Sequence, residues 1–154
     1  RLSTTFKSST KAHIGPTSKV NLYLINNSQS YRDQWDIIGM VLNRSKRLCE
    51  EHHAALIVFS LTQPEQVYLD RREQYLAVYN ITEPIVDFER PDKELLATCK
   101  QFNITCYATL HEVQEYANVS GKRGVNDGDA HYNSFGNHVH AMILYKYISE
   151  EIIS

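Results

Sequence analysis

The sequence has no apolar run long enough to cross a bilayer, no cluster of basic residues and only three cysteines. A membrane-spanning helix needs about 20 consecutive apolar residues, and a nucleic-acid-binding surface needs clustered Lys and Arg side chains. The formal net charge is −2 at pH 7. We therefore expect no membrane span in this chain and no nucleic-acid partner.

The beginning of the chain lacks the apolar centre of a signal peptide, and its first residue is Arg1 rather than Met. We interpret the chain as a processed product or as part of a longer polypeptide. Residues 1–19 are rich in Ser, Thr and Lys and show no periodicity, which predicts an extended arm or linker. Residues 20–154 are sufficient for one domain with its own core, because 42% of the sequence is hydrophobic.

The three cysteines are Cys49, Cys99 and Cys106. An odd number excludes complete internal pairing. Cys99 and Cys106 lie near the end of one predicted helix and the start of the next predicted strand, where a disulfide is geometrically possible in an oxidising compartment. Buried thiols that pack as small apolar side chains are the equal alternative.

Five asparagines stand in Asn-x-Ser/Thr sequons: Asn26, Asn43, Asn80, Asn103 and Asn118. Such sites receive glycans on the surface of secreted proteins. Their number favours a secreted or lumenal glycoprotein, with sugar expected on at least one of Asn43, Asn80 and Asn118. We expect Asn103 to be a poor acceptor, because it adjoins a predicted buried strand.

Helical stripes alternate with short apolar runs along the chain. Apolar residues at helical spacing predict helices over 36–52, 92–102 and 134–148. The runs Ala54–Leu61 and Ile104–Leu110 predict strands that are buried on both faces, as in a parallel sheet. This alternation is typical of an α/β layered fold.

Shorter segments give less definite patterns. Residues 69–79 predict a further helix, 111–116 a short helix or turn, and 118–126 a polar loop. The segment Val20–Ile25 fits a strand and a short helix equally well. The adjacent pair His52–His53 predicts a solvated helix end rather than a metal site, because neighbouring residues do not share a helix face.

Polar residues with catalytic potential gather directly before the last predicted helix. A histidine there, His131, can act as a general base, and a nearby carboxylate can orient it and stabilise its charged form. Asp129 is the first candidate for that carboxylate, and Asp127 is the alternative. A polar loop whose Asp caps a turn is the structural alternative. Asn133 or Ser134 can cap the helix that follows.

The same stretch contains residue types that bind metals: Asp127, Asp129, His131, His138 and His140. His138 and His140 point to different faces of the predicted helix. We therefore expect no metal site and no cofactor.

The wider pattern Asp129-Ala-His131-Tyr-Asn133-Ser-Phe-Gly136-Asn-His138, followed by a helix, resembles the last block of SGNH (GDSL-like) hydrolases. The resemblance covers about residues 30–150. It implies a three-layer α/β/α fold with a parallel, flavodoxin-like sheet, and acyl-ester hydrolysis or O-acyl transfer, often on carbohydrates. It would make His131 the triad base and Asp129 its orienting acid, with Asn133, Gly136 and His138 as framework residues.

The triad still needs a nucleophile. The Gly-Asp-Ser-like turn that carries the serine in the resembled family, and the Gly and Asn that donate to its oxyanion, do not stand in this chain. Ser60 ends a predicted strand, which favours a structural role. We therefore expect this chain to be the second half of such a domain and to pair with a separate segment or chain that carries the nucleophile. The alternative function is a non-catalytic binding module that keeps the fold.

Overall fold

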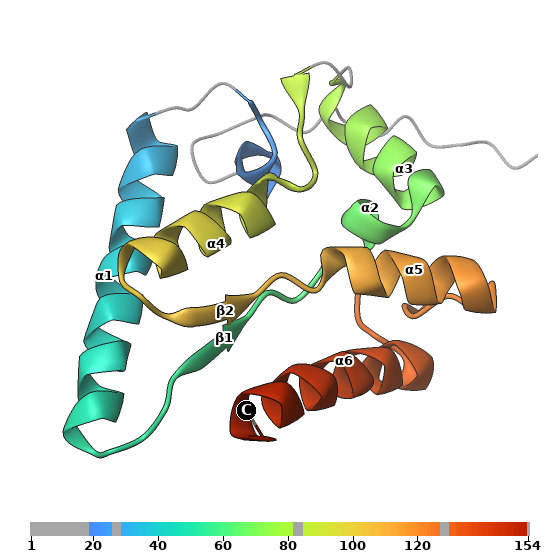
Figure 1. Cartoon of the computed structure of the whole chain (residues 1–154). Coiled ribbons are helices and arrows are strands. Elements are labelled where there is room, and N and C mark those ends of the chain that lie inside the picture. Colours follow the sequence, from blue (N-terminus) through green and yellow to red (C-terminus); the bar gives the residue numbers. More distant parts are fainter. Residues whose placement is uncertain (1–18, 26–28, 82–84, 127–129, 154) are drawn as a thin grey trace, which may run out of the picture.

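The computed structural model describes residues 19–25, 29–81, 85–126 and 130–153 (Figure 1). The described part of the chain is mostly helical and contains a two-stranded parallel sheet. The elements in chain order are the 3₁₀ helix η1 (Lys19–Leu22), α1 (Gln29–Glu51), β1 (Ile57–Phe59), α2 (Pro64–Val67), α3 (Leu69–Tyr79), α4 (Arg90–Gln101), β2 (Thr105–Tyr107), α5 (Leu110–Ser120) and α6 (Ser134–Ile153). The predicted arm, apart from Lys19, lies outside the described residues.

The two strands occur where the sequence predicted them, and they are parallel. Their register pairs Ile57 with Thr105 and Phe59 with Tyr107. Helices α4 and α6 lie on opposite sides of this strand pair (Figure 1). This arrangement agrees with the predicted α/β class.

The predicted strands are nevertheless too long and too buried. Only the middle of each apolar run pairs, and Leu110 already begins α5. The strand residues are half-buried, so the expectation of strands buried on both faces is wrong for the described residues. In this part of the chain each of the two strands has a neighbouring strand on one edge only, so its other edge stays accessible.

Helix α1 begins at Gln29, well before the predicted start at Asp36. Side-chain hydrogen bonds within its first turns, from Gln29 to Asp33 at 2.7 Å and from Arg32 to Gln29 at 2.7 Å, support the added turns. Trp35, directly before the predicted start, therefore lies within the helix and is half-buried. The end is as predicted, since the pair after Glu51 is exposed.

The remaining boundaries differ by a few residues. The segment Val20–Ile25 is a 3₁₀ helix followed by a single antiparallel bridge from Leu24 to Val86, so it is neither a full strand nor an α-helix. Helix α5 extends to Ser120, past the predicted loop start, and ends at Gly121 with a φ of 63°. Helix α3 lies over the predicted residues.

Two small apolar clusters form the core. The first joins Tyr23, Leu76 and Phe88, and the second joins Val113 of α5 to Val139 and Ile143 of α6. Two apolar residues of the predicted helices are exposed: Leu96 of α4 at 40% and Met142 of α6 at 41%. The helices of this chain therefore cover less apolar surface than their sequence patterns predict.

All three cysteines are free thiols in the structure, which favours the second of the two alternatives for Cys99 and Cys106. Cys99 is buried on α4, and Cys106 is half-buried on β2. Burial, followed by the hydrogen bond with the neighbouring Cys99 thiol, raises the pKa of Cys106 above its ordinary value. The raised pKa keeps the Cys106 thiol neutral, so Cys106 packs beside the buried Cys99 as an unreactive side chain.

Asp92 is a buried carboxylate in the first turn of α4, with 7% exposure and no hydrogen-bond partner for Oδ2 in the described part of the chain. Burial raises the pKa of this carboxyl, although a hydrogen bond with Ser60 and the charge of His111 oppose the change. A raised carboxyl pKa means that the charged form destabilises the folded state. The group therefore contributes stability only at low pH and loses it as the pH rises through the raised pKa.

We expect Asp92→Asn to raise the free energy of unfolding at pH 7 by about 1–3 kcal/mol, because the buried charge is removed. The gain should shrink as the pH falls through the raised pKa, where both proteins carry a neutral side chain. Urea denaturation at several pH values measures this. Asp70→Asn is the control with the opposite sign, because a hydrogen bond from Arg123 lowers the pKa of the Asp70 carboxyl. A wild-type protein more stable than Asp92→Asn at pH 7 would contradict the prediction.

Candidate functional site

His131 lies on an exposed loop that is closed by a short antiparallel contact. Val125 pairs with Tyr132, and the Asn126 amide donates to the His131 carbonyl at 3.0 Å. The His131 side chain is exposed. Both candidate carboxylates, Asp127 and Asp129, lie outside the described residues, so their relation to the imidazole stays a prediction.

Tyr132 fixes this loop to the end of β1. Its hydroxyl lies 2.7 Å from Thr62 Oγ1 and also donates to the Thr62 carbonyl. Thr62 is 2% exposed and stands three residues after the last residue of β1. The residue next to His131 is therefore bound directly to the carboxyl end of the strand.

His140 completes this buried cluster from the first turns of α6. Its ring centroid lies 4.4 Å from that of Tyr132, and its Nε2 lies 3.5 Å from Thr62 Oγ1. Its Nδ1 donates to the Gly136 carbonyl at 2.9 Å. Burial raises the pKa of Tyr132, with the Thr62 hydrogen bond opposing it, so the phenol stays neutral and can donate. The sequence analysis did not identify Thr62 and Tyr132 as the residues that anchor the loop. The available signals were a threonine directly after a predicted strand and a tyrosine directly after His131.

Asn133 and Gly136 hold the start of α6 against the same loop. Asn133 Oδ1 accepts from the Gly136 amide at 3.0 Å, which is a helix cap, and its Nδ2 donates to the carbonyls of Arg123 and Val125 at 2.8 and 3.1 Å. Gly136 lies against the backbone of Gly124. Ser134, the other predicted cap, is the first residue of the helix.

The histidines proposed as alternative metal ligands do not gather. His138 is exposed, whereas His140 is buried and bonded as described above. Within the described ranges, no group of three His, Cys, Asp or Glu side chains is arranged to hold a metal ion.

An open cleft of about 340 Å³ lies beside the loop. Its walls come from α2 and α3, and Ala130, which precedes His131, also lines it. Glu65 on this wall is oriented by the Tyr23 hydroxyl, which donates to Glu65 Oε1 at 3.1 Å. Burial, followed by the Glu65 charge, raises the pKa of Tyr23, so this donor keeps its proton.

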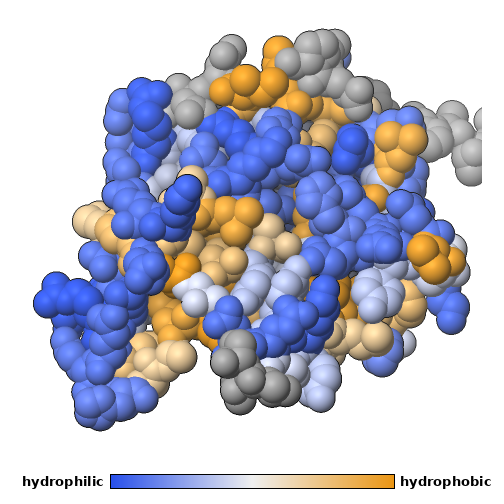
Figure 2. Space-filling model, in the orientation of Figure 1, coloured by the Kyte–Doolittle hydropathy of each residue, from blue (hydrophilic) through white to orange (hydrophobic). Residues whose placement is uncertain are grey.

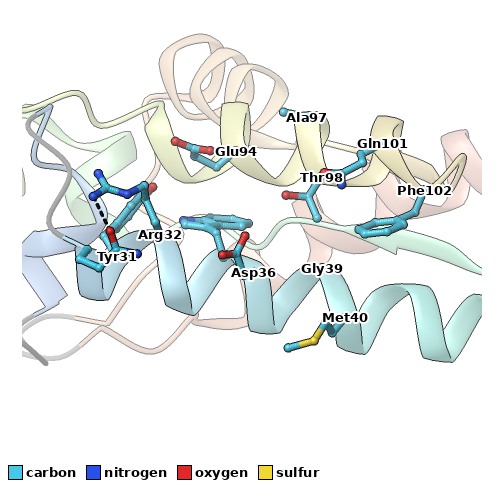
Figure 3. Close-up of a pocket in the computed structure, with 12 residues that line it drawn as sticks. Tyr31, Arg32, Asp36, Gly39, Met40, Glu94, Ala97, Thr98, Gln101 and Phe102 are labelled. Carbon is cyan, nitrogen blue, oxygen red and sulfur yellow. Dashed lines mark hydrogen bonds between the residues drawn. The ribbon is translucent and has the colours of Figure 1, made fainter.

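A second groove, of about 580 Å³, lies between α1 and α4 (Figure 3). Arg32 and Asp36 reach into it from α1, and Thr98 points toward α1 from α4 (Figure 3). All its lining residues belong to these two helices or to Phe102, which directly follows α4. None of the residues predicted as catalytic lines this groove, so it is separate from the His131 loop.

No protein-family model, curated protein or solved structure matches this chain. In the described part of the chain, no helix is both long enough and apolar enough to cross a membrane.

Ser60 has a structural role, because both its side chain and its carbonyl are hydrogen-bonded to Thr109. Its Oγ accepts from the Thr109 amide at 3.1 Å, and its carbonyl accepts from Thr109 Oγ1 at 2.8 Å. Thr109 has no exposed surface. These bonds join the ends of the two strands, which agrees with the structural role expected for Ser60.

Proposed function

We propose that this chain supplies the base His131 and the acid Asp129 of a Ser–His–Asp triad in an SGNH-type ester hydrolase or O-acyltransferase. The observation that supports this most is the bond between Tyr132 and Thr62, which holds the neighbouring His131 at the carboxyl end of β1. Ligands of α/β sheets bind outside this edge. A general base on a short, anchored loop there is positioned to meet a nucleophile from an adjacent strand.

The two residues would divide the chemistry in the usual way for a triad. His131 takes the proton of a serine hydroxyl as the serine attacks the ester carbonyl, and then gives that proton to the departing alcohol. Asp129 orients the imidazole and stabilises its charged form. Water, or the hydroxyl of an acceptor, then attacks the acyl-enzyme, and His131 acts as base again.

The serine of this triad would come from outside the chain. Ser60, at the end of β1, is occupied by Thr109. An added segment would also cover apolar side chains that are exposed on α1. Ile37, Val41 and Leu48 recur at helical spacing and are 55%, 58% and 47% exposed. Their exposure on one face supports a further part of a three-layer domain, whose sheet would extend from the free edge of β1.

The test of the triad is ester turnover by the complete protein, meaning this chain together with the segment that carries the serine. His131→Ala should abolish nearly all turnover, whereas His52→Ala, at an exposed histidine after the end of α1, should not. Equal activity of the two variants would refute the proposed base.

We further propose that the protein is secreted or lumenal, with glycan on at least one of Asn43, Asn80 and Asn118. Asn80 and Asn118 are exposed and Asn43 is half-buried. Asn103 is exposed too, at a φ of 52°, so burial does not exclude it as an acceptor. The intact mass of natively expressed protein should fall after enzymatic removal of N-glycans. An unchanged mass, or a cytosolic location, would contradict the prediction.

A further inference from the structure

We propose that the groove between α5 and α6 binds an amphipathic helix of a partner protein, a helix whose apolar stripe is bordered by Lys or Arg side chains. This groove shares no lining residue with the cleft beside α3 or with the groove between α1 and α4. The inference therefore adds a docking surface and does not depend on the proposed triad.

The groove follows two neighbouring helices. It has a volume of about 750 Å³, and all its lining residues belong to α5 or α6, which lie side by side (Figure 1). The helices are antiparallel. Glu112, near the start of α5, accepts a hydrogen bond from Tyr147 in the second half of α6, whereas Lys122, just after α5, lies over the ring of Phe135 at the start of α6. Such a groove offers a third helix two rows of side chains to pack against.

The floor of the groove is fixed by the core of the molecule. Ile143, which lines the groove, is buried and packs in one apolar cluster with Val113 of α5. The Tyr147 hydroxyl donates to Glu112 across the two helices, and the Tyr147 ring stacks on Tyr107 of β2 with the centroids 4.0 Å apart. A ligand would meet a groove that is already formed, so little ordering of the protein opposes binding.

Large apolar side chains line the groove and are exposed. Val119 is 83% exposed and Tyr145 is 75% exposed, and Tyr116 and Met142 are exposed as well. Tyr116 and Val119 are three residues apart on α5, as are Met142 and Tyr145 on α6, so each pair occupies one helix face. Tyr and Met are enriched in protein interfaces, and grouped exposed apolar side chains are typical of an interaction site.

Carboxylates dominate the charges of the groove. Glu112, Glu115 and Glu150 line it together with one cation, Lys146. Neither Glu115 nor Glu150 forms an ion pair with another residue in the described ranges. A partner helix with Lys or Arg along the borders of its apolar stripe would pair with these carboxylates, and a helix bordered by Asp or Glu would be repelled.

The same charge argues against other occupants of an apolar groove. In a symmetric pair of copies each groove faces the same groove of the partner, so carboxylates would meet carboxylates. An anionic lipid surface would be repelled in the same way. The segment proposed to carry the serine is expected at the free edge of β1 and over α1, and no residue of α1 or β1 lines this groove.

Labelled peptides added to the whole 154-residue chain test the groove by fluorescence anisotropy. The first peptide is a designed helix of about five turns, with Leu at helical spacing and Lys on both borders of the Leu stripe. The second has Glu in place of every Lys, and the third keeps the composition of the first but scatters the Leu residues. The Lys peptide should bind with a Kd of about 1–100 μM, about tenfold more tightly than either of the others, and added salt should weaken its binding.

Matched variants locate the binding on the chain. Val119→Ser should weaken binding of the Lys peptide about tenfold, whereas Val78→Ser, the same change at an exposed valine of α3, should not. Glu115→Lys should weaken that binding about fivefold and strengthen binding of the Glu peptide. Glu73→Lys makes the same charge change at an exposed position of α3 and should leave both affinities within about twofold. All four positions are exposed, so we expect each variant to fold.

Several results would contradict the inference outright. Absence of Lys-peptide binding, equal binding of the Glu peptide, or an equal loss in Val119→Ser and Val78→Ser would each overturn it. A dimer of the chain in sedimentation velocity that Val119→Ser abolishes would assign the groove to a second copy instead.

The remaining occupants are separated in the same way. Binding of the chain to phosphatidylserine vesicles that Val119→Ser abolishes would overturn the inference in favour of a membrane surface. Loss of Lys-peptide binding once the serine-carrying segment is added would overturn it in favour of that segment. None of these outcomes bears on ester turnover by His131→Ala, so the docking surface and the triad are tested separately.

Discussion

Replacing His131 by alanine is expected to lower kcat for ester hydrolysis by about three to six orders of magnitude. A serine hydroxyl is a weak nucleophile unless an adjacent base accepts its proton, so no other group can restore the lost step. The His131 side chain is exposed on its loop. The free energy of unfolding should therefore change little, and the effect should lie in kcat rather than in the amount of folded protein.

The carboxylate partner is identified by a parallel pair of substitutions. Asp129→Asn should also cause a large loss of kcat, smaller than that of His131→Ala, because the imidazole keeps its position but loses its orienting charge. Asp127→Asn should leave most of the activity. If Asp127 proves essential and Asp129 dispensable, the assignment of the acid is wrong while the base remains.

The control for His131 is His52→Ala, which removes another exposed imidazole, after the end of α1 and outside the candidate site. Activity of this variant should stay within about twofold of the unsubstituted protein, since exposed positions outside special sites tolerate substitution. Near-normal hydrolysis of a nitrophenyl ester by His131→Ala would end the proposal. A nitrophenyl ester releases its coloured alcohol directly, so this assay needs no knowledge of the natural substrate.

The elements that local patterns specify were predictable from the sequence. Helical spacing identified α3, α4 and α6, and the two apolar runs identified the parallel strands β1 and β2. Their ends were less predictable, because α1 gains its first turns from polar side-chain bonds that leave no apolar stripe. Figure 2 shows apolar and polar side chains intermixed on one face of the molecule, so apolar spacing alone does not tell which side of a helix is covered.

The candidate site was predictable only in part. His131 could be chosen from its residue type and its neighbours in the chain. The bond that anchors its loop joins Thr62 and Tyr132, which are 70 residues apart in the sequence. Arg71 of α3, which lines the cleft, donates a hydrogen bond to the Asn126 carbonyl of the same loop, 55 residues away in the sequence. Contacts over such separations depend on how the elements pack, and no local spacing encodes them.

Gly136→Ala is expected to be the most destabilising small substitution in the described part of the chain. A Cβ at Gly136 would lie 2.0 Å from the Gly124 carbonyl oxygen and 2.8 Å from its carbon. Backbone atoms cannot rotate away as a side chain can, so the loop and α6 must separate. We expect the free energy of unfolding to fall by more than about 3 kcal/mol, although alanine alone would favour the helix by about 1 kcal/mol.

The separation of α6 from the loop should also disturb the candidate site, because the contact between Gly136 and Gly124 holds the loop in place. The Gly124 carbonyl accepts from the Asn133 amide at 3.0 Å, and the Gly124 amide donates to the Tyr68 hydroxyl at 2.6 Å. Moving Gly124 strains both hydrogen bonds and shifts the antiparallel bridge between Val125 and Tyr132, which lies next to His131. Gly136→Ala should therefore lower ester turnover even at temperatures where the protein is still folded.

Gly39→Ala is the matched control, since it adds the same methyl group to a glycine inside a helix. The nearest atom to its added Cβ is Phe102 Cε2 at 3.0 Å, and that ring is part of a side chain that can move. Its cost should stay below about 1 kcal/mol, because the gain in helix propensity offsets part of the crowding. Urea denaturation of the two variants gives the comparison. A Gly136→Ala protein as stable as Gly39→Ala would show that α6 does not cross the loop at the distance described, and the anchoring of His131 would then lose its structural support.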